Sequence, residues 1–228
     1  KVEYDEAGRM KRLIDPEGHP IELTYNPEES IQIVQDAYNF PTIYKYDSQG
    51  NVIAETDAKG GIIHRAYDDN NNLTSESDPD GVTASYTYDA FGNITAIADE
   101  DGNTTRMSYN SRGQLLSLIS PTGQTTTNSY DSKGRLTQQT SPDGRTTQWG
   151  YDATGNPNRI VDSRGNAVDA TYDLNGRMQS ATSQVTVNGQ TQTLSTSFTY
   201  DGEGRTLSST NSLGNSQSNT YNALGHLI

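Results

Sequence analysis

The residues of this 228-residue chain that could do acid–base or nucleophilic chemistry do not converge on one pattern. His19, His64 and His226 share no carboxylate or nucleophile in the sequence, so a Ser-His-Asp site is disfavoured. Cysteine is absent, which excludes thiol nucleophiles and thiolate metal sites. Most recurrent aspartates begin turns, and turn chemistry explains them without a paired-carboxylate glycosidase. We therefore expect no catalytic residue and predict that the chain is not an enzyme.

Clustered oxygen ligands make calcium the one metal to consider. Residues 99–103 read Asp-Glu-Asp-Gly-Asn and residues 68–72 read Asp-Asp-Asn-Asn-Asn. Neither stretch has the spacing of an EF-hand loop or its distal bidentate Glu. The favoured interpretation is solvated acidic turns, and we expect no metal site and no cofactor.

The bulk composition narrows the class of partner. The net charge of −13 would repel phosphate backbones, which disfavours nucleic acid. No window approaches 18 consecutive apolar residues, so no membrane span is expected. Only 30% of the residues are hydrophobic, against about 45–50% in ordinary globular chains. Yet the chain has 14 Tyr beside 3 Phe and 1 Trp, and this excess of tyrosine argues against a disordered chain.

The tyrosines follow a period of 21 residues. We call the periodic ones the ladder tyrosines, and each is followed by Asp or Asn; they are Tyr4, Tyr25, Tyr46, Tyr67, Tyr88, Tyr109, Tyr130, Tyr151, Tyr172, Tyr200 and Tyr221. A glycine stands four residues after most of them, and Asn71 replaces it once. A second Asp/Ser-x-x-Gly turn follows in most units, as in 78–81 and 141–144. Such a period indicates a repeat architecture.

The turn chemistry predicts short hairpins. Asp, Asn or Ser starts each turn, and glycine at the fourth position accepts the positive φ of a type I turn with a following left-handed residue. Two turns per 21 residues leave strands of six or seven residues. Alternation before each ladder tyrosine predicts one buried and one wet face. The expected fold is all-β: a long antiparallel meander of short hairpins, coiled into a curved ribbon or part of a hollow β-shell.

Two units depart from the pattern. Unit 25–45 lacks both turn glycines, and we interpret it as a degenerate strand pair rather than a helix, because Asn26, Ile31 and Asp36 remain in phase. The interval between Tyr172 and Tyr200 is 28 residues and contains two β-prone arms about Asn188-Gly189, which predicts an extended hairpin over 177–200.

The repeats run the length of the sequence. We expect residues 1–228 to form a single array of about ten units. The chain begins three residues before a ladder tyrosine and stops within an expected strand, which predicts a piece truncated at both ends.

The repeated motif resembles the YD repeats of the Rhs family. It is seen as Tyr88-Asp89-Ala90-Phe91-Gly92-Asn93-Ile94 and as Tyr130-Asp131-Ser132-Lys133-Gly134-Arg135-Leu136. This family includes Rhs polymorphic toxins, B and C components of insecticidal toxin complexes, wall-associated toxins and teneurins. The resemblance implies a hollow shell that encloses a C-terminal toxin in the bacterial members and forms part of an adhesion receptor in teneurins. The Asp-Pro-x-Gly sequences at 15–18 and 78–81 are in phase with ordinary second turns, so the family's self-cleaving role is not assigned to them.

These observations lead to two functional hypotheses. The first is a non-catalytic segment of a YD-repeat shell in a secreted or surface bacterial protein, whose partners are the rest of the shell and an enclosed toxin or effector. The second is a cell-surface adhesion or carbohydrate-binding module, because the periodic tyrosines and Trp149 could stack on sugars.

Overall fold

The computed structural model describes residues 1–81, 83–187 and 190–228, and these form strands and turns without a helix. No helix that could span a membrane is found among them. The strands are β1 Val2–Tyr4, β2 Met10–Ile14, β3 Pro20–Asn26, β4 Ile31–Gln35, β5 Pro41–Tyr46, β6 Val52–Thr56, β7 Ile62–Tyr67, β8 Leu73–Ser77, β9 Thr83–Tyr88, β10 Ile94–Ala98, β11 Thr104–Tyr109, β12 Leu115–Ile119, β13 Thr125–Tyr130, β14 Leu136–Thr140, β15 Thr146–Tyr151, β16 Pro157–Val161, β17 Ala167–Tyr172, β18 Met178–Val187, β19 Gln190–Tyr200, β20 Thr206–Asn211 and β21 Ser216–Ser218.

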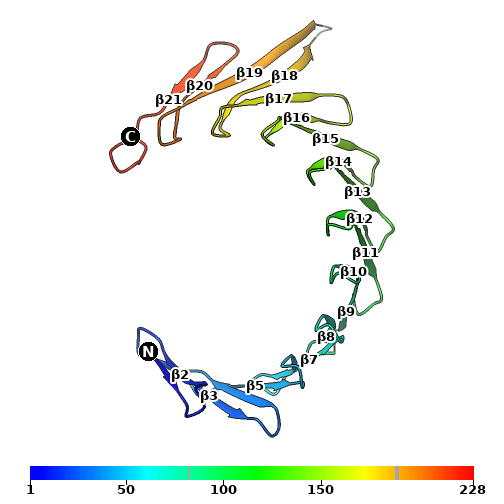
Figure 1. Cartoon of the computed structure of the whole chain (residues 1–228), viewed down its shortest axis with the longest axis vertical. Coiled ribbons are helices and arrows are strands. Elements are labelled where there is room, and N and C mark those ends of the chain that lie inside the picture. Colours follow the sequence, from blue (N-terminus) through cyan, green and yellow to red (C-terminus); the bar gives the residue numbers. More distant parts are fainter. Residues whose placement is uncertain (82, 188–189) are drawn as a thin grey trace. The chain divides into compact units, whose positions relative to one another are not determined.

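Consecutive strands pair with each other in two compact units. The first unit comprises residues 1–113 and 118–123, and the second comprises 114–117 and 124–228. In the first unit β1 to β11 pair in chain order, every pair antiparallel, as the hairpins in Figure 1 show. In the second unit β13 to β21 do the same. The predicted antiparallel meander is confirmed.

The turn geometry agrees with the prediction. At the turn of 89–92, the Gly92 amide donates to the Asp89 carbonyl at 3.1 Å and the Asp89 amide donates to the Asn93 carbonyl at 2.9 Å. Gly92 has φ +82°, and Asn71, which replaces a turn glycine, has φ +64°. Asparagine is among the few residues that tolerate this left-handed region.

In most repeats a β-bulge beside the turn sets the cross-strand partner of the ladder tyrosine. Tyr88 lies opposite Ile94, and the register shifts between Ile94 and Ala96. Tyr46 lies opposite Val52 in the same way. The aliphatic residue two after the turn glycine is therefore the cross-strand partner of the tyrosine, as the spacing predicts.

Burial differs from the sequence-based expectation. Alternation is present on strands such as β7, β9 and β13, where half-buried and exposed residues alternate. However, β4, β6, β8 and β14 are half-buried along both faces, and no described residue is fully buried. The prediction of one buried face was wrong because one layer of sheet has nothing packed on it to exclude water.

The degenerate segment is a strand pair, but its register has moved. Asn26 lies opposite Ile31, and Tyr25 lies opposite Gln32 without a bulge. In an ordinary unit the tyrosine faces the sixth residue after it, as Tyr4 faces Met10. Ile31 still begins β4, as Met10 begins β2, so the predicted strand pair is present; the turn is one residue longer, and the missing bulge compensates before Asp36.

The long interval forms an extended hairpin. Strands β18 and β19 pair continuously from Ser180 opposite Ser197 to Val187 opposite Gln190. The predicted turn residues Asn188 and Gly189 lie outside the described residues. Because an antiparallel hairpin lengthens at its tip, the added residues leave the pairing of β17 and β20 with their neighbours in place.

Two turn glycines with similar positive φ differ in whether an added Cβ would have a neighbour. An added Cβ at Gly113 (φ +74°) would lie 3.4 Å from Asn93 Oδ1, whereas at Gly102 (φ +79°) it would meet nothing within 4 Å. We expect Gly102→Ala to reduce the free energy of unfolding by about 1 kcal/mol through left-handed strain. Gly113→Ala should cost about the same, because 3.4 Å is an ordinary van der Waals contact that adds no clash to the left-handed strain. Urea denaturation measures both losses, and a much larger loss at Gly113 would contradict this expectation.

Candidate functional site

Where a turn begins with aspartate, the carboxylate accepts hydrogen bonds from backbone amides of the same turn. Asp5 Oδ1 accepts the backbone amides of Ala7 at 3.0 Å and Arg9 at 2.8 Å, and Asp5 Oδ2 accepts the Arg9 side chain at 2.8 Å. Where the residue after the turn glycine is Asn, its side-chain amide replaces the guanidinium, as Asn93 does at Asp89. The recurrent aspartates are thus structural, with their oxygens occupied by the turn.

These hydrogen bonds stabilise the ionised carboxylates. The pKa of Asp152 falls from 3.8 to about 2, chiefly because the side chains of Thr154 and then Asn156 donate to it, with further backbone donors. The pKa of Asp89 is lowered for the same reason by the Asn93 side chain and amide. A hydrogen bond to the charged form favours that form.

The hydroxyl of a ladder tyrosine ties one repeat to the one before it. Tyr88 donates to the Leu73 carbonyl, 15 residues earlier, at 2.7 Å. Burial raises the pKa of Tyr88, with Tyr86 and Asp68 contributing, so the phenol stays protonated to donate. The same bond recurs as Tyr25 to Met10, Tyr67 to Val52, Tyr130 to Leu115, Tyr151 to Leu136, Tyr172 to Pro157, Tyr200 to Met178 and Tyr221 to Thr206.

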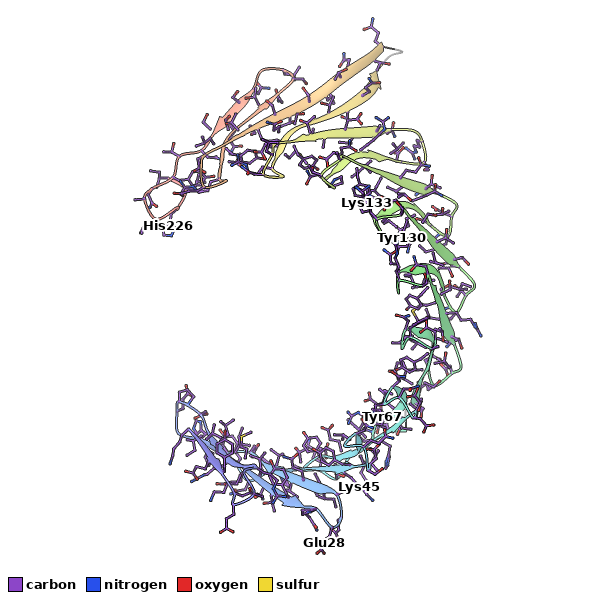
Figure 2. All side chains as sticks on the ribbon, in the orientation of Figure 1. Glu28, Lys45, Tyr67, Tyr130, Lys133 and His226 are labelled. Atoms are coloured by element: carbon purple, nitrogen blue, oxygen red, sulfur yellow. The ribbon has the colours of Figure 1, made fainter. Side chains whose placement is uncertain are left out.

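An arginine that follows the glycine of a ladder-tyrosine turn makes a second contact between repeats, in the other direction along the chain. Each such guanidinium lies over the next ladder tyrosine: the carbon at its centre is 4.4–4.9 Å from the ring centroid in the pairs Arg9–Tyr25, Arg135–Tyr151, Arg177–Tyr200 and Arg205–Tyr221. These are cation–π contacts. Figure 2 labels Tyr130, at the end of β13, and Lys133, in the turn that precedes Arg135.

The arginine or asparagine that follows one turn glycine also lies close to the next turn glycine. An added Cβ would lie 3.4 Å from Asn156 Oδ1 at Gly176, and 3.3 Å from Arg205 Nη1 at Gly225. At the second turns, Gly60, Gly81 and Gly102 would meet nothing within 4 Å. The turn glycines that contact a neighbouring turn thus lie on the edge that carries the tyrosines, while at the other edge Gly61 lies close to Pro79 of the next second turn.

The sequence-based candidates for chemistry stay dispersed. His19 Nδ1 lies 3.0 Å from Asp15 Oδ2 in the turn after β2, and His64 lies in β7. His226 lies in the last turn, where its backbone amide donates to Asn222. No group of three His, Cys, Asp or Glu side chains suited to a metal ion is found among the described residues.

The two stretches considered for calcium are ordinary turns. Asp68 accepts the amides of Asn70 and Asn72 and the Asn72 side chain, and Asp99 accepts the equivalent groups of Asp101 and Asn103. Their first carboxylate is therefore occupied by donors from its own turn. The polar groups of the turns and of the ladder tyrosines therefore serve to hold each repeat against its neighbours.

Sequence reasoning missed two residues of this arrangement. The arginine or asparagine after the turn glycine is visible in the repeat, but its reach to the next tyrosine has no local signal. The acceptor of the tyrosine hydroxyl is a backbone carbonyl, which every residue has, so only the 15-residue spacing in the folded chain identifies it. The recurrence of both Tyr and Arg/Asn at one period was the available hint.

Two protein-family models match the sequence of this chain. The teneurin YD-shell family model matches residues 1–129, more than half of the chain. The chain belongs to the teneurin YD-shell family. The RHS repeat model matches residues 130–167. No curated protein matches the sequence.

Solved structures of TcdB2-TccC3 and of a Tc holotoxin pore share the fold. "Crystal Structure of TcdB2-TccC3-TEV" is 20% identical with a TM-score of 0.75, covering 100% of this chain and 14% of that one. The structure of a Photorhabdus luminescens Tc holotoxin pore with a substituted TccC3 is 20% identical with a TM-score of 0.73, covering 98% of this chain and 14% of that one. This YD-shell chain therefore spans about one seventh of the length of the proteins it resembles.

The tyrosine hydroxyl bond can be tested by removing one oxygen. We expect Tyr88→Phe to lower the free energy of unfolding by about 0.5–1.5 kcal/mol, because the Leu73 carbonyl loses its donor. Tyr38→Phe is the matched control: Tyr38 lies off the ladder and is 77% exposed, so its effect should stay within about 0.5 kcal/mol. Urea denaturation reports both, and indistinguishable values would argue against the tie.

The aspartate clasp predicts a pH dependence. Because the pKa of Asp152 is about 2 in the folded chain and 3.8 without these donors, ionisation stabilises the fold above pH 4, and this stabilisation is lost as pH falls to about 2. Asp152→Asn should therefore lower Tm at pH 7 and match the wild type near pH 2. Asp69→Asn removes the same charge from an exposed turn position. Thermal unfolding from pH 7 to 2 should show convergence for the first variant only.

Proposed function

We propose that this chain is a non-catalytic wall segment of a YD-repeat shell that encapsulates a C-terminal toxin or effector in a secreted or surface bacterial protein. The observation that carries the proposal is the tie from one repeat to the next. The recurrent polar groups, the tyrosine hydroxyl, the turn aspartate and the arginine, are used to hold the wall together. Its partners are then the rest of its own shell and the enclosed domain.

The thinness of the structure supports the same role. No described residue is fully buried, so each repeat has surface on both sides of the sheet. A wall needs two such surfaces, one toward solvent and one toward its contents. The acidic charge of −13 keeps the surface hydrated and disfavours adhesion to nucleic acid.

Proteolysis of the complete parent protein tests encapsulation. The cargo should resist protease while the shell is intact, and electron microscopy should show hollow particles. Tyr88→Asp, which places a charge in the ladder, should make the cargo at least about tenfold more sensitive to protease. Tyr38→Asp, at an exposed turn tip, should leave it protected. An open filament without enclosed cargo would contradict the proposal.

An adhesion or carbohydrate-binding role is the second candidate, favoured by the match of residues 1–129 to the teneurin YD-shell. It requires selective binding to a surface ligand rather than containment. Glycan-array screening of the chain separates the two roles: a wall segment should bind no glycan selectively, whereas a saturable signal for one glycan class would favour adhesion.

A further inference from the structure

One place in the first unit lacks the tie that links its neighbours. At Gly92 and Gly113 the residue after the preceding turn glycine reaches an added Cβ, to 3.8 Å and 3.4 Å. At Gly50 an added Cβ would meet nothing within 4 Å, and the repeat before it is the degenerate one. The side-chain contact to the turn glycine is therefore missing here, although the Tyr46 hydroxyl still reaches the preceding repeat.

The altered turn of residues 26–31 explains the missing contact. Ile31 lies opposite Asn26, the place that Arg9 takes opposite Asp5. An isoleucine has neither a guanidinium nor an amide to extend toward the next repeat. Tyr46 also changes its partner: its hydroxyl donates to Gln32 Oε1 at 2.7 Å rather than to a backbone carbonyl.

A pocket occupies this interval. Its volume is about 390 Å³, and it is lined by Arg9, Tyr25, Asn26, Pro27, Ser30, Ile31, Gln32 and Tyr46. Burial raises the pKa of Tyr46, with contributions from Tyr44 and Tyr25, so its ring is neutral at physiological pH. The pocket thus offers aromatic rings and side-chain amides, whereas four ladder tyrosines elsewhere have a guanidinium over the ring.

The one charged group in the pocket lining is already paired within its own turn, and carboxylates lie nearby. Arg9 is the one positive group in its lining, and it is held by Asp5 at 2.8 Å while it stacks on Tyr25. Lys45 precedes Tyr46 in β5 and so points to the opposite face. Glu28 and Glu29 lie exposed in the adjoining turn, and Figure 2 labels Glu28 at its tip.

We propose that this pocket binds the guanidinium of an arginine side chain supplied by another polypeptide segment. The ligand would stack on Tyr46 as Arg135 stacks on Tyr151, at 4.4 Å from the centroid. It would give Tyr46 the stacked guanidinium that Arg9 gives Tyr25, in the interval where Ile31 stands and the following repeats have Asn51, Asn72 and Asn93. The proposal goes beyond a wall role and holds whether the parent protein encloses cargo or adheres to a surface.

Titration with arginine and its neutral isostere tests this assignment. The 228-residue chain, labelled with ¹³C on tyrosine rings, is titrated with N-acetyl-arginine amide and separately with N-acetyl-citrulline amide. The Tyr46 ring signals should shift saturably, with at least about fivefold tighter binding for arginine, equivalent to about 1 kcal/mol. Equal affinity of the two probes, or equal shifts at all ladder tyrosines, would overturn the proposal.

Variants locate the site independently of that comparison. Ile31→Arg should fill the pocket from within, abolish binding of the arginine probe and raise Tm. Ile33→Arg adds the same charge to β4 outside the pocket lining and should leave binding intact. Tyr46→Phe should retain binding because the ring remains, whereas Tyr46→Leu should lose it; if the leucine variant does not fold, the other three decide.

A sugar ligand is the alternative outcome. Tyrosine rings beside amides also suit carbohydrate, so methyl glucoside and methyl galactoside are titrated against the same signals. Saturable shifts with a glycoside and none with arginine would overturn the guanidinium assignment. Persistence of arginine binding in Ile31→Arg would do so as well.

Discussion

The absence of a buried core is the constraint on which the rest of this structure depends. No described side chain is fully withdrawn from water, so hydrophobic burial alone cannot hold the repeats in register. The hydrogen bond from Tyr88 to the Leu73 carbonyl, repeated along the ladder, supplies directional contact instead. The half-buried ring adds apolar contact that phenylalanine could also make, so the hydroxyl bond explains why tyrosine fills this position.

The same constraint explains the composition. Asp5 satisfies two amides of its turn and orients Arg9, and Arg9 then covers Tyr25. One aspartate therefore fixes a turn and positions the group that links it to the next repeat. Acidity, tyrosine content and glycine content are three consequences of one repeated unit rather than separate properties of the chain.

Because the 21-residue repeat is so regular, the two places where the chain departs from it can be identified. Residues 26–31 keep their strands but lose the turn glycine and the bulge, and the missing side chain leaves an opening beside Tyr46. The extended hairpin of β18 and β19 is a departure of another kind, because it adds length at a tip and disturbs no neighbouring pair. The repeated sheet can vary at such places because the contacts between the other repeats preserve the fold.

The sequence by itself determined what depends on neighbours in the chain. An Asp-x-x-Gly turn closes within four residues, so the turns, the strand lengths, the antiparallel meander and the pairing of Tyr88 with Ile94 were all predictable. Only the tertiary structure decided the acceptor of each hydroxyl, the stacking of Arg135 on Tyr151 and the shifted register at Ile31. These depend on distances between groups about 15 or more residues apart, or on a bulge whose loss leaves the sequence period unchanged.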